Sequence, residues 1–174
     1  MRGSAMPRIT PLESVPDNPM GQLNIFRTLG RHPKMLDGFG RLGGFLLSGK
    51  GFPPRERELV ILRTGWRGNS IYEWGQHVII GKQCGLSDEE IARIPKGADA
   101  PGWSLLDRAL LRATDELHAE AFVSDATWSE LAGALSTQQL MDLVFTVGQY
   151  NLVSMALNSF GVQPEPGLAP LPRS

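Results

Sequence analysis

Apolar residues recur every three or four positions along most of the chain, which is the spacing of amphipathic helices. One such stripe occupies residues 55–67 and a second occupies residues 103–120, whereas the two-residue alternation of strands is not found. Their apolar positions are Leu59, Leu62 and Trp66 in the first stripe, and Leu106, Leu110, Ala113 and Leu117 in the second. The segment from 137 to 159 is apolar almost all round, which predicts a helix that is central to a bundle or shared between subunits. The pattern therefore predicts an all-α fold.

Helix start signals divide these stripes into elements. At four places a serine is followed three residues later by an acid or amide, as in a capping box. The pairs are Ser70 with Glu73, Ser87 with Glu90, Ser104 with Asp107, and Ser136 with Gln139. Pro53-Pro54 supplies another start, and Gly85 is placed to end a helix in the left-handed conformation.

The 174 residues are expected to form a single helical domain with a core of ordinary size. Residues 1–21 are rich in proline and glycine and are predicted to form an extended arm, in which residues 1–4 resemble an expression-vector remnant. The helical domain is expected over residues 22–162. Residues 163–174 contain four prolines, so this tail cannot be helical throughout.

Composition excludes several classes of protein. The net charge of −1 and the pI near 6.3 provide no basic surface for nucleic acid and no polybasic membrane anchor. A single cysteine excludes an internal disulfide framework and a CxxC redox pair. No uninterrupted apolar run reaches the ~18 residues of a membrane span, and the N-terminus lacks the apolar region of a signal peptide. We therefore expect a cytoplasmic protein with neither a nucleic-acid nor a membrane partner.

The candidate chemistry lies around residues 58–77. Glu73 and His77 are four residues apart in a predicted helix, so their side chains project from the same face. The same face continues through an apolar strip, which is expected to withdraw both groups from water and make proton transfer useful. Glu58, on the preceding helix beside Ile61 and Leu62, is the third member of this predicted catalytic set.

Each of these residues also has a purely structural interpretation. Arg55 stands three residues before Glu58 and would form an ordinary ion pair with it. Glu73 would serve only as the last residue of the Ser70 capping box. His77 alone would be a hydrogen-bonded core histidine. The conjunction of two acids and an imidazole favours catalysis over these alternatives.

A metal site and a reactive thiol are not predicted. The three histidines (His32, His77 and His118) include no second histidine at ligand spacing from His77. Cys84 would need a cationic neighbour to become a thiolate, and the nearby Lys82 points away from it on a helix. We therefore interpret Cys84 as structural.

Aromatic and amide side chains around the site are candidate ligand contacts. Trp66, Tyr72 and Trp74 either line a pocket for a cyclic ligand or pack in the core. Gln149, Asn151 and Asn158 are polar groups on the largely apolar final helix, so each needs a partner. One of the three is a candidate to face the pocket.

Three motifs resemble the carboxymuconolactone decarboxylase family, which also contains the AhpD-like alkyl hydroperoxidases. They are Arg57-Glu58-Leu59-Val60-Ile61-Leu62-Arg63, then Tyr72-Glu73-Trp74 with His77, and Gly85-Leu86-Ser87 with Glu89-Glu90-Ile91. The resemblance extends over about residues 20–162 and is most specific between Arg55 and Ile91.

The resemblance implies an AhpD-like helical bundle that forms a homotrimer or homohexamer and uses no metal or organic cofactor. It implies a small carboxylated lactone or cyclic acid as substrate, with lyase, isomerase or hydrolase chemistry of the kind used in aromatic catabolism. Glu58, Glu73 and His77 would then be the catalytic residues. The expected substrate-binding residues are Arg57 and Arg63, which would orient a carboxylate, together with Tyr72 and Trp74.

The hydroperoxidase branch of the family carries redox cysteines seven and four residues before the histidine. Ser70 and Glu73 occupy these positions here, so dithiol peroxide chemistry is expected to be absent. Two alternatives to the lyase hypothesis remain. One is a non-catalytic ligand-binding protein, and the other is the disfavoured alkylhydroperoxidase.

Overall fold

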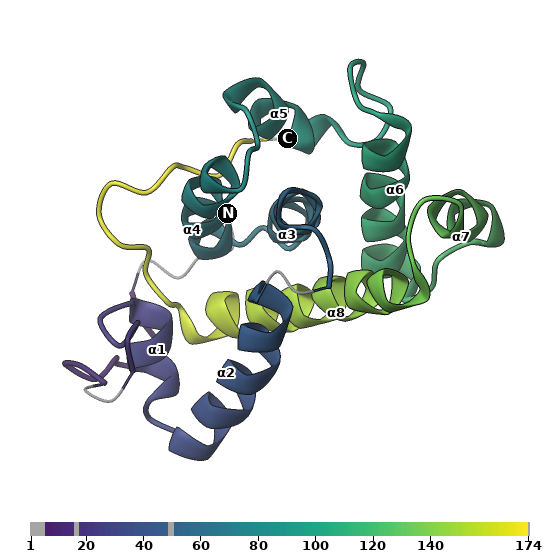
Figure 1. Cartoon of the computed structure of the whole chain (residues 1–174). Coiled ribbons are helices and arrows are strands. Elements are labelled where there is room, and N and C mark those ends of the chain that lie inside the picture. The colour runs from purple at the N-terminus through teal and green to yellow at the C-terminus, as the bar shows by residue number, and fades with distance from the viewer. Residues whose placement is uncertain (1–5, 16–17, 49–50, 174) are drawn as a thin grey trace.

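The computed structural model describes residues 6–15, 18–48 and 51–173, and every regular element in these ranges is helical (Figure 1). The α-helices are α1 (Asn24–Leu29), α2 (Pro33–Leu47), α3 (Pro54–Arg67), α4 (Ile71–Gln83), α5 (Asp88–Arg93), α6 (Leu105–Glu120), α7 (Asp125–Ala132) and α8 (Thr137–Phe160), with a 3₁₀ turn, η1 (Ile94–Lys96), after α5. The predicted all-α fold is confirmed. Residues 1–4, the suspected vector remnant, lie outside the described ranges.

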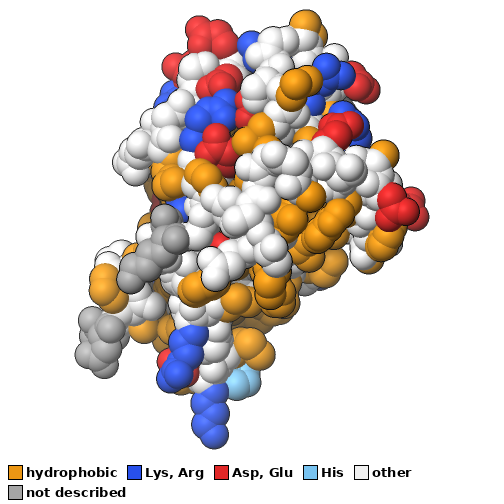
Figure 2. Space-filling view, turned by 45° about the vertical axis from the view of Figure 1, so that its right-hand side comes forward, with side chains coloured by type: hydrophobic (Ala, Val, Ile, Leu, Met, Phe, Trp, Pro, Cys, Tyr) orange, Lys and Arg blue, Asp and Glu red, His pale blue; other side chains and the backbone are white. Residues whose placement is uncertain are grey.

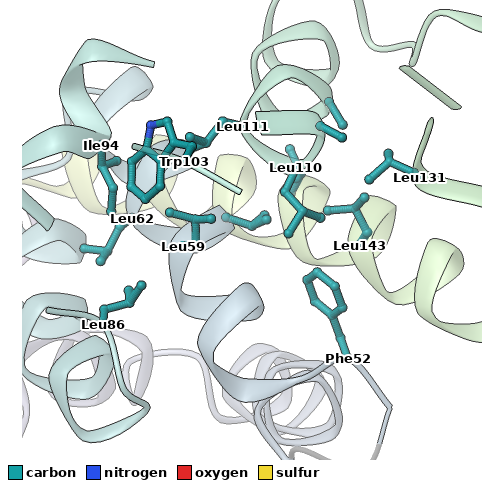
Figure 3. Close-up of a cluster of buried hydrophobic side chains, with 14 of the residues drawn as sticks. Phe52, Leu59, Leu62, Leu86, Ile94, Trp103, Leu110, Leu111, Leu131 and Leu143 are labelled. Atoms are coloured by element: carbon teal, nitrogen blue, oxygen red, sulfur yellow. The ribbon is translucent and has the colours of Figure 1, made fainter. Parts of the chain in front are cut away.

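Helix α3 is the centre of the molecule. Figure 1 shows it nearly end-on, with α4, α6 and α8 around it. Four successive residues, Leu59 to Leu62, are fully buried, so α3 has no solvent face along this stretch. Figure 3 shows α3 side chains packed among leucines from α6, α7 and α8. The labelled core residues are Phe52, Leu59, Leu62, Leu86, Ile94, Trp103, Leu110, Leu111, Leu131 and Leu143.

The capping predictions divide into two outcomes. Ser87 and Ser136 form complete capping boxes, and the Ser104 hydroxyl accepts the amide of Asp107. The box predicted at Ser70 is wrong, because the Ser70 side chain caps nothing. Glu73 is turned instead toward His77 on its own helix.

Helix α8 has two apolar faces. It is the one described helix that is long and apolar enough to cross a membrane, but half of its most apolar stretch is buried inside the molecule. The buried half packs in the bundle, which is the first of the two roles that the sequence predicted for this helix. Met141, Phe145, Leu152 and Met155 of α8 are exposed, which leaves the second role, a helix shared between subunits, as a prediction.

Helices α1 and α2 lie to one side of the bundle, where they contact each other and α2 packs against α8 (Figure 1). Helix α2 begins with Pro33, and the His32 ring accepts the amide of Met35 as an N-cap. It contains four glycines, and most of its residues are exposed. Between α2 and the bundle lies the space that forms the candidate site.

Residues 163–173 contain no helix and run from the end of α8 across α4 toward α5 (Figure 1). The carboxylate of Glu165 fastens this tail. It accepts hydrogen bonds from the backbone amide of Asn24 at 2.7 Å, the Tyr72 hydroxyl at 3.0 Å and the side-chain amide of Gln76 at 2.5 Å. One tail residue thus joins α1 to α4.

Candidate active site

Glu58, Glu73 and His77 converge, as the sequence predicted. The Nδ1 atom of His77 lies 2.6 Å from Oε2 of Glu58, and its Nε2 atom lies 3.0 Å from Oε1 of Glu73. Helix α4 supplies Glu73 and His77 one turn apart, and α3 supplies Glu58 from the buried centre of the molecule. The imidazole is therefore held between two carboxylates, which defines the Glu58–His77–Glu73 set.

All three members of this set are withdrawn from water. Glu58 has no exposed surface, whereas Glu73 and His77 keep 4% and 6% of theirs. Burial lowers the pKa of the His77 imidazole, but hydrogen bonding to both glutamates and the charges of the two carboxylates outweigh it and raise the pKa to about 10. His77 is consequently an imidazolium at neutral pH.

Arg57 completes the charge balance behind this set. Its Nε atom donates to Oε1 of Glu58 at 3.0 Å, and its guanidinium also donates to the carbonyl of Leu47 at 3.3 Å. The side chain of Arg57 is 5% exposed. The two cations and two anions of Arg57, Glu58, His77 and Glu73 offset one another, as buried charges must.

The proposed ion pair between Arg55 and Glu58 is wrong. Arg55 pairs with Asp107 on α6 at 2.8 Å and with Glu90 on α5. Both acids lie far from Arg55 in sequence, so helix spacing alone gave no sign of them. Glu58 is left to Arg57 and His77.

The set opens onto a cavity of about 460 Å³, called here the site cavity. Its wall is formed by α1, α2, α4 and α8 and by the loop before α1. The lining residues are Asn18, Pro19, Met20, Leu23, Ile25, Phe26, Phe39, Gly40, Gly43, Gly44, Leu47, Tyr72, Glu73, Gln76, His77, Ile80, Gln149, Tyr150 and Val153. Glu73 and His77 reach this wall, while Glu58 lies behind them.

The four predicted substrate-binding residues lie in different places. Tyr72 lines the site cavity, and its hydroxyl donates a hydrogen bond to Glu165. The pKa of this hydroxyl is raised, mainly because the side chain is buried. Trp74 is 2% exposed and packs in the core cluster. Arg57 stands behind Glu58, and Arg63 is turned to the opposite side of α3. The Arg63 guanidinium binds the carboxylate of Asp115 at 2.8 Å.

Tyr150 was not predicted as a site residue. Its ring meets the His77 ring edge-on, with centroids 5.0 Å apart, and it lines the site cavity. Gln149, one of three amides singled out as needing partners, lines the same wall. The signal available in the sequence was the polar run of Gln149, Tyr150 and Asn151 within an otherwise apolar helix.

Cys84 does not carry an activated thiol. Its sulfur lies 3.8 Å from the guanidinium of Arg57, a cationic neighbour that the sequence did not indicate. Burial and the charge of Glu58 nevertheless raise the pKa of the thiol and outweigh Arg57. Lys82 pairs with Asp88 instead. Within the described residues, no group of three or more His, Cys, Asp and Glu side chains is arranged to hold a metal ion.

The carboxymuconolactone decarboxylase family matches residues 33–116 of the chain. No curated protein matches the sequence. Among solved structures, an uncharacterized peroxidase-related protein from Silicibacter sp. TM1040 is 15% identical and superposes with a TM-score of 0.76, covering 94% of this chain and 96% of that chain.

Two further structures share the fold. A protein of unknown function from Agrobacterium tumefaciens, ascribed to the AhpD antioxidant defence proteins, is 19% identical with a TM-score of 0.73, covering 79% of this chain and 94% of that one. The debrominase Bmp8, in complex with 2,3,4-tribromopyrrole, is 14% identical with a TM-score of 0.71, covering 80% and 75%. At these identities the likeness establishes an AhpD-like fold.

Proposed function

We propose that this chain, which belongs to the carboxymuconolactone decarboxylase family, is a cofactor-free acid–base enzyme that transfers a proton to or from carbon in a small cyclic substrate. The observation that carries this proposal is the buried Glu58–His77–Glu73 set with one end open to the site cavity. A carboxylate held there by an imidazolium is placed to exchange a proton with a bound molecule.

Glu73 is the member that meets the substrate. In the forward step its carboxylate takes a proton from a carbon next to a carbonyl. The C–H bond breaks, an O–H bond forms on Glu73, and the electron pair moves into the carbonyl oxygen. Returning the proton to another carbon isomerises the substrate. In a decarboxylation, the lost carbon dioxide leaves the same electron pair behind, and the acid form of Glu73 protonates the carbon.

His77 and Glu58 act through Glu73. The imidazolium N–H at 3.0 Å fixes the orientation of the Glu73 carboxylate, and Glu58 fixes the ring from the other side at 2.6 Å. Arg57 balances the charge of Glu58. These three are positioning residues in this proposal, and they keep the base fixed in a buried site.

Decarboxylation of a carboxylated lactone, the reaction that the family is named for, stays a prediction for this chain. Among the described residues that line the site cavity there is no arginine or lysine, so the wall offers no ready ion pair to a substrate carboxylate. Isomerisation or another proton transfer on an uncharged cyclic carbonyl compound therefore fits this wall better.

The fold neighbours include AhpD-related proteins, but the positions of the redox cysteines hold Ser70 and Glu73 here. Dithiol peroxide chemistry therefore stays the disfavoured alternative.

A substrate panel tests the proposal. Carboxylated lactones and β-keto acids are followed for carbon dioxide release, and unsaturated cyclic ketones and lactones for double-bond migration by ultraviolet absorbance. For any substrate accepted, Glu73→Gln is expected to lower kcat by at least about 10²-fold, because it removes the proton acceptor. His77→Asn is expected to lower kcat as well.

The matched control is Glu120→Gln, which neutralises an exposed glutamate of α6 and should turn over like the parent. Unchanged turnover in both Glu73→Gln and His77→Asn would contradict the proposal. Tight binding of a panel member without any chemical change would support the non-catalytic alternative instead.

A further inference from the structure

Two buried polar side chains in the wall of the site cavity have hydrogen-bonding groups to spare. Gln149 is 7% exposed and Tyr150 is 5% exposed, and both line the cavity. Neither side chain hydrogen-bonds to another residue in the described part of the chain. A polar side chain that faces a cavity without a protein partner is placed to bind a ligand or an ordered water.

Some neighbouring polar residues on α8 have partners, whereas the buried hydroxyls of Thr146 and Ser154 have none among the described residues and do not line the cavity. Asn151 lies 2.7 Å from the Nδ1 atom of His118, and Asn158 donates to the Gly68 carbonyl at 2.8 Å. Tyr72, in the same cavity wall as Tyr150, has its hydroxyl bonded to Glu165. Among the α8 side chains without a partner in the described chain, Gln149 and Tyr150 are the two that line the site cavity, where a ligand can reach them.

Tyr150 lies beside the candidate base. Its ring contacts His77 edge-on, and the charge of Glu73 acts on its hydroxyl. Burial first, and then the charges of Glu73 and Glu58, raise the pKa of this hydroxyl well above its usual value. The hydroxyl therefore keeps its proton and remains a hydrogen-bond donor through the physiological range.

The charges on the cavity wall restrict the chemical class of ligand that can bind. Glu73 and His77 are bonded to each other there, and the rest of the described lining carries no ionised side chain. A negatively charged group would meet the Glu73 carboxylate without a free cation to offset it. The large apolar share of the lining and the aromatic rings of Phe26, Phe39 and Tyr72 suit a flat, uncharged molecule.

We infer that Gln149 and Tyr150 bind the carbonyl oxygen of a small uncharged cyclic ketone or lactone, with Tyr150 donating a hydrogen bond to that oxygen while Glu73 removes a proton from the adjacent carbon. This inference rests on the proposed function and names its substrate class. As the C–H bond breaks, the electron pair moves onto the carbonyl oxygen, where the Tyr150 O–H stabilises the growing negative charge. The reverse step returns a proton from Glu73 to carbon, so atoms and electrons balance without a further reactant.

Exchange of α-protons for deuterium tests the inference without knowledge of the natural substrate. Cyclohexanone and δ-valerolactone are the uncharged probes, and 3-oxocyclohexane-1-carboxylate is the charged one. Each is incubated with the protein in D₂O, and loss of the α-proton signal is followed by NMR, with the dissociation constant measured by ligand titration. The parent is expected to exchange at least one uncharged probe, and about tenfold faster than the charged probe.

The variants separate the roles of the residues. Tyr150→Phe is expected to lower the exchange rate of the bound probe about 10²-fold with little change in dissociation constant, because it removes a donor used only as charge develops. Gln149→Leu is expected to weaken binding. Asn151→Leu, an amide of the same helix outside the cavity, is the control and should exchange like the parent. Thermal melting verifies that each variant is folded.

Each outcome bears on one claim. Exchange that depends on Glu73 but is unaffected by both Tyr150→Phe and Gln149→Leu would overturn this inference and leave the proposed function standing. Exchange that persists in Glu73→Gln would overturn the proposed function itself. Preference for the charged probe, or failure of the parent to bind or exchange either uncharged probe, would overturn the substrate class.

Discussion

At the scale of single residues, His77 links the stability of the fold to pH. Its pKa in the folded protein is about 10, above the ~6.5 of the unfolded chain, because two carboxylates hold its proton. A raised pKa contributes stability that is fully present below about pH 6.5 and is lost as the pH rises toward 10.

The measurement is the free energy of unfolding in urea for the parent and for His77→Gln at pH 6.5 and pH 10. We expect the parent's advantage over His77→Gln to be larger at pH 6.5 and to shrink at pH 10. An advantage that is independent of pH would contradict the assignment of a charged His77.

Contacts between residues of one helix could be predicted from the sequence, whereas contacts between helices mostly could not. The spacing of four placed Glu73 and His77 on one helical face, and both are indeed together. The approach of Glu58 to His77 crosses from α3 to α4, so helix spacing could not show it, and it was expected only from the conjunction of two acids with an imidazole and from the family resemblance. The partners of Arg55 and Arg63, at Asp107 and Asp115, come from a helix some fifty residues away, and periodicity within one helix says nothing about such pairs.

At the scale of elements, Arg55 joins the start of α3 to α5 and α6 through Glu90 and Asp107. Burial raises the pKa of both carboxyl groups, but their hydrogen bonds outweigh it and lower the pKa, with Arg55 a donor to each. A lowered pKa contributes stability that is present above the ordinary carboxyl range and is lost as the pH falls.

Arg55→Leu is therefore expected to lower the free energy of unfolding by about 1–3 kcal/mol at pH 7 and by less at pH 3. The matched control is Arg41→Leu, which removes an exposed pair with Asp37 on α2 and should cost about 0.5 kcal/mol or less. Equal losses for the two variants at pH 7 would show that the three-helix junction contributes nothing beyond a surface ion pair.

The elements differ in how clearly the sequence marked them. The stripes and start signals predicted α3, α4, α6 and α8 near their observed bounds, because each has a buried face several turns long. Helix α2 carries few such signals, since it contains four glycines and remains largely exposed. Its cap is a histidine ring and a proline, which the serine-based signals could not indicate.

At the scale of the whole molecule, α8 carries an exposed stripe of apolar side chains. Its exposed positions 141, 145, 148, 152 and 155 alternate by four and three residues, as in a helix–helix seam. The stripe passes through Gly148, where an added Cβ would meet nothing within 4 Å. Two antiparallel copies crossing near Gly148 would bring Phe145 of one copy close to Leu152 of the other. Figure 2 shows hydrophobic side chains gathered across one face of the molecule.

We therefore propose that α8 forms a twofold contact between copies, which fits the homohexamer rather than the homotrimer among the two assemblies that the resemblance implies. Phe145→Glu is expected to shift the protein to a smaller species in size-exclusion chromatography with light scattering, because two buried carboxylates would face the seam. Leu105→Glu alters an exposed leucine of α6 and serves as the control. A parent that is monomeric at high micromolar concentration would contradict the proposal.

The hydroxyl of Ser70 has no partner inside the described protein, although the residue is fully buried at the start of α4. A thiol tolerates such surroundings better than a hydroxyl does. Ser70 and Glu73 also occupy the two positions where the hydroperoxidase branch carries its cysteines, beside an imidazole already backed by Glu58. Under the proposed function, Ser70→Cys with Glu73→Cys replaces a proton-transfer site by a dithiol one, and we expect the double variant to consume hydroperoxide when a reductant is supplied. That outcome would make the two chemistries near neighbours in evolution, separated by two side chains on one scaffold.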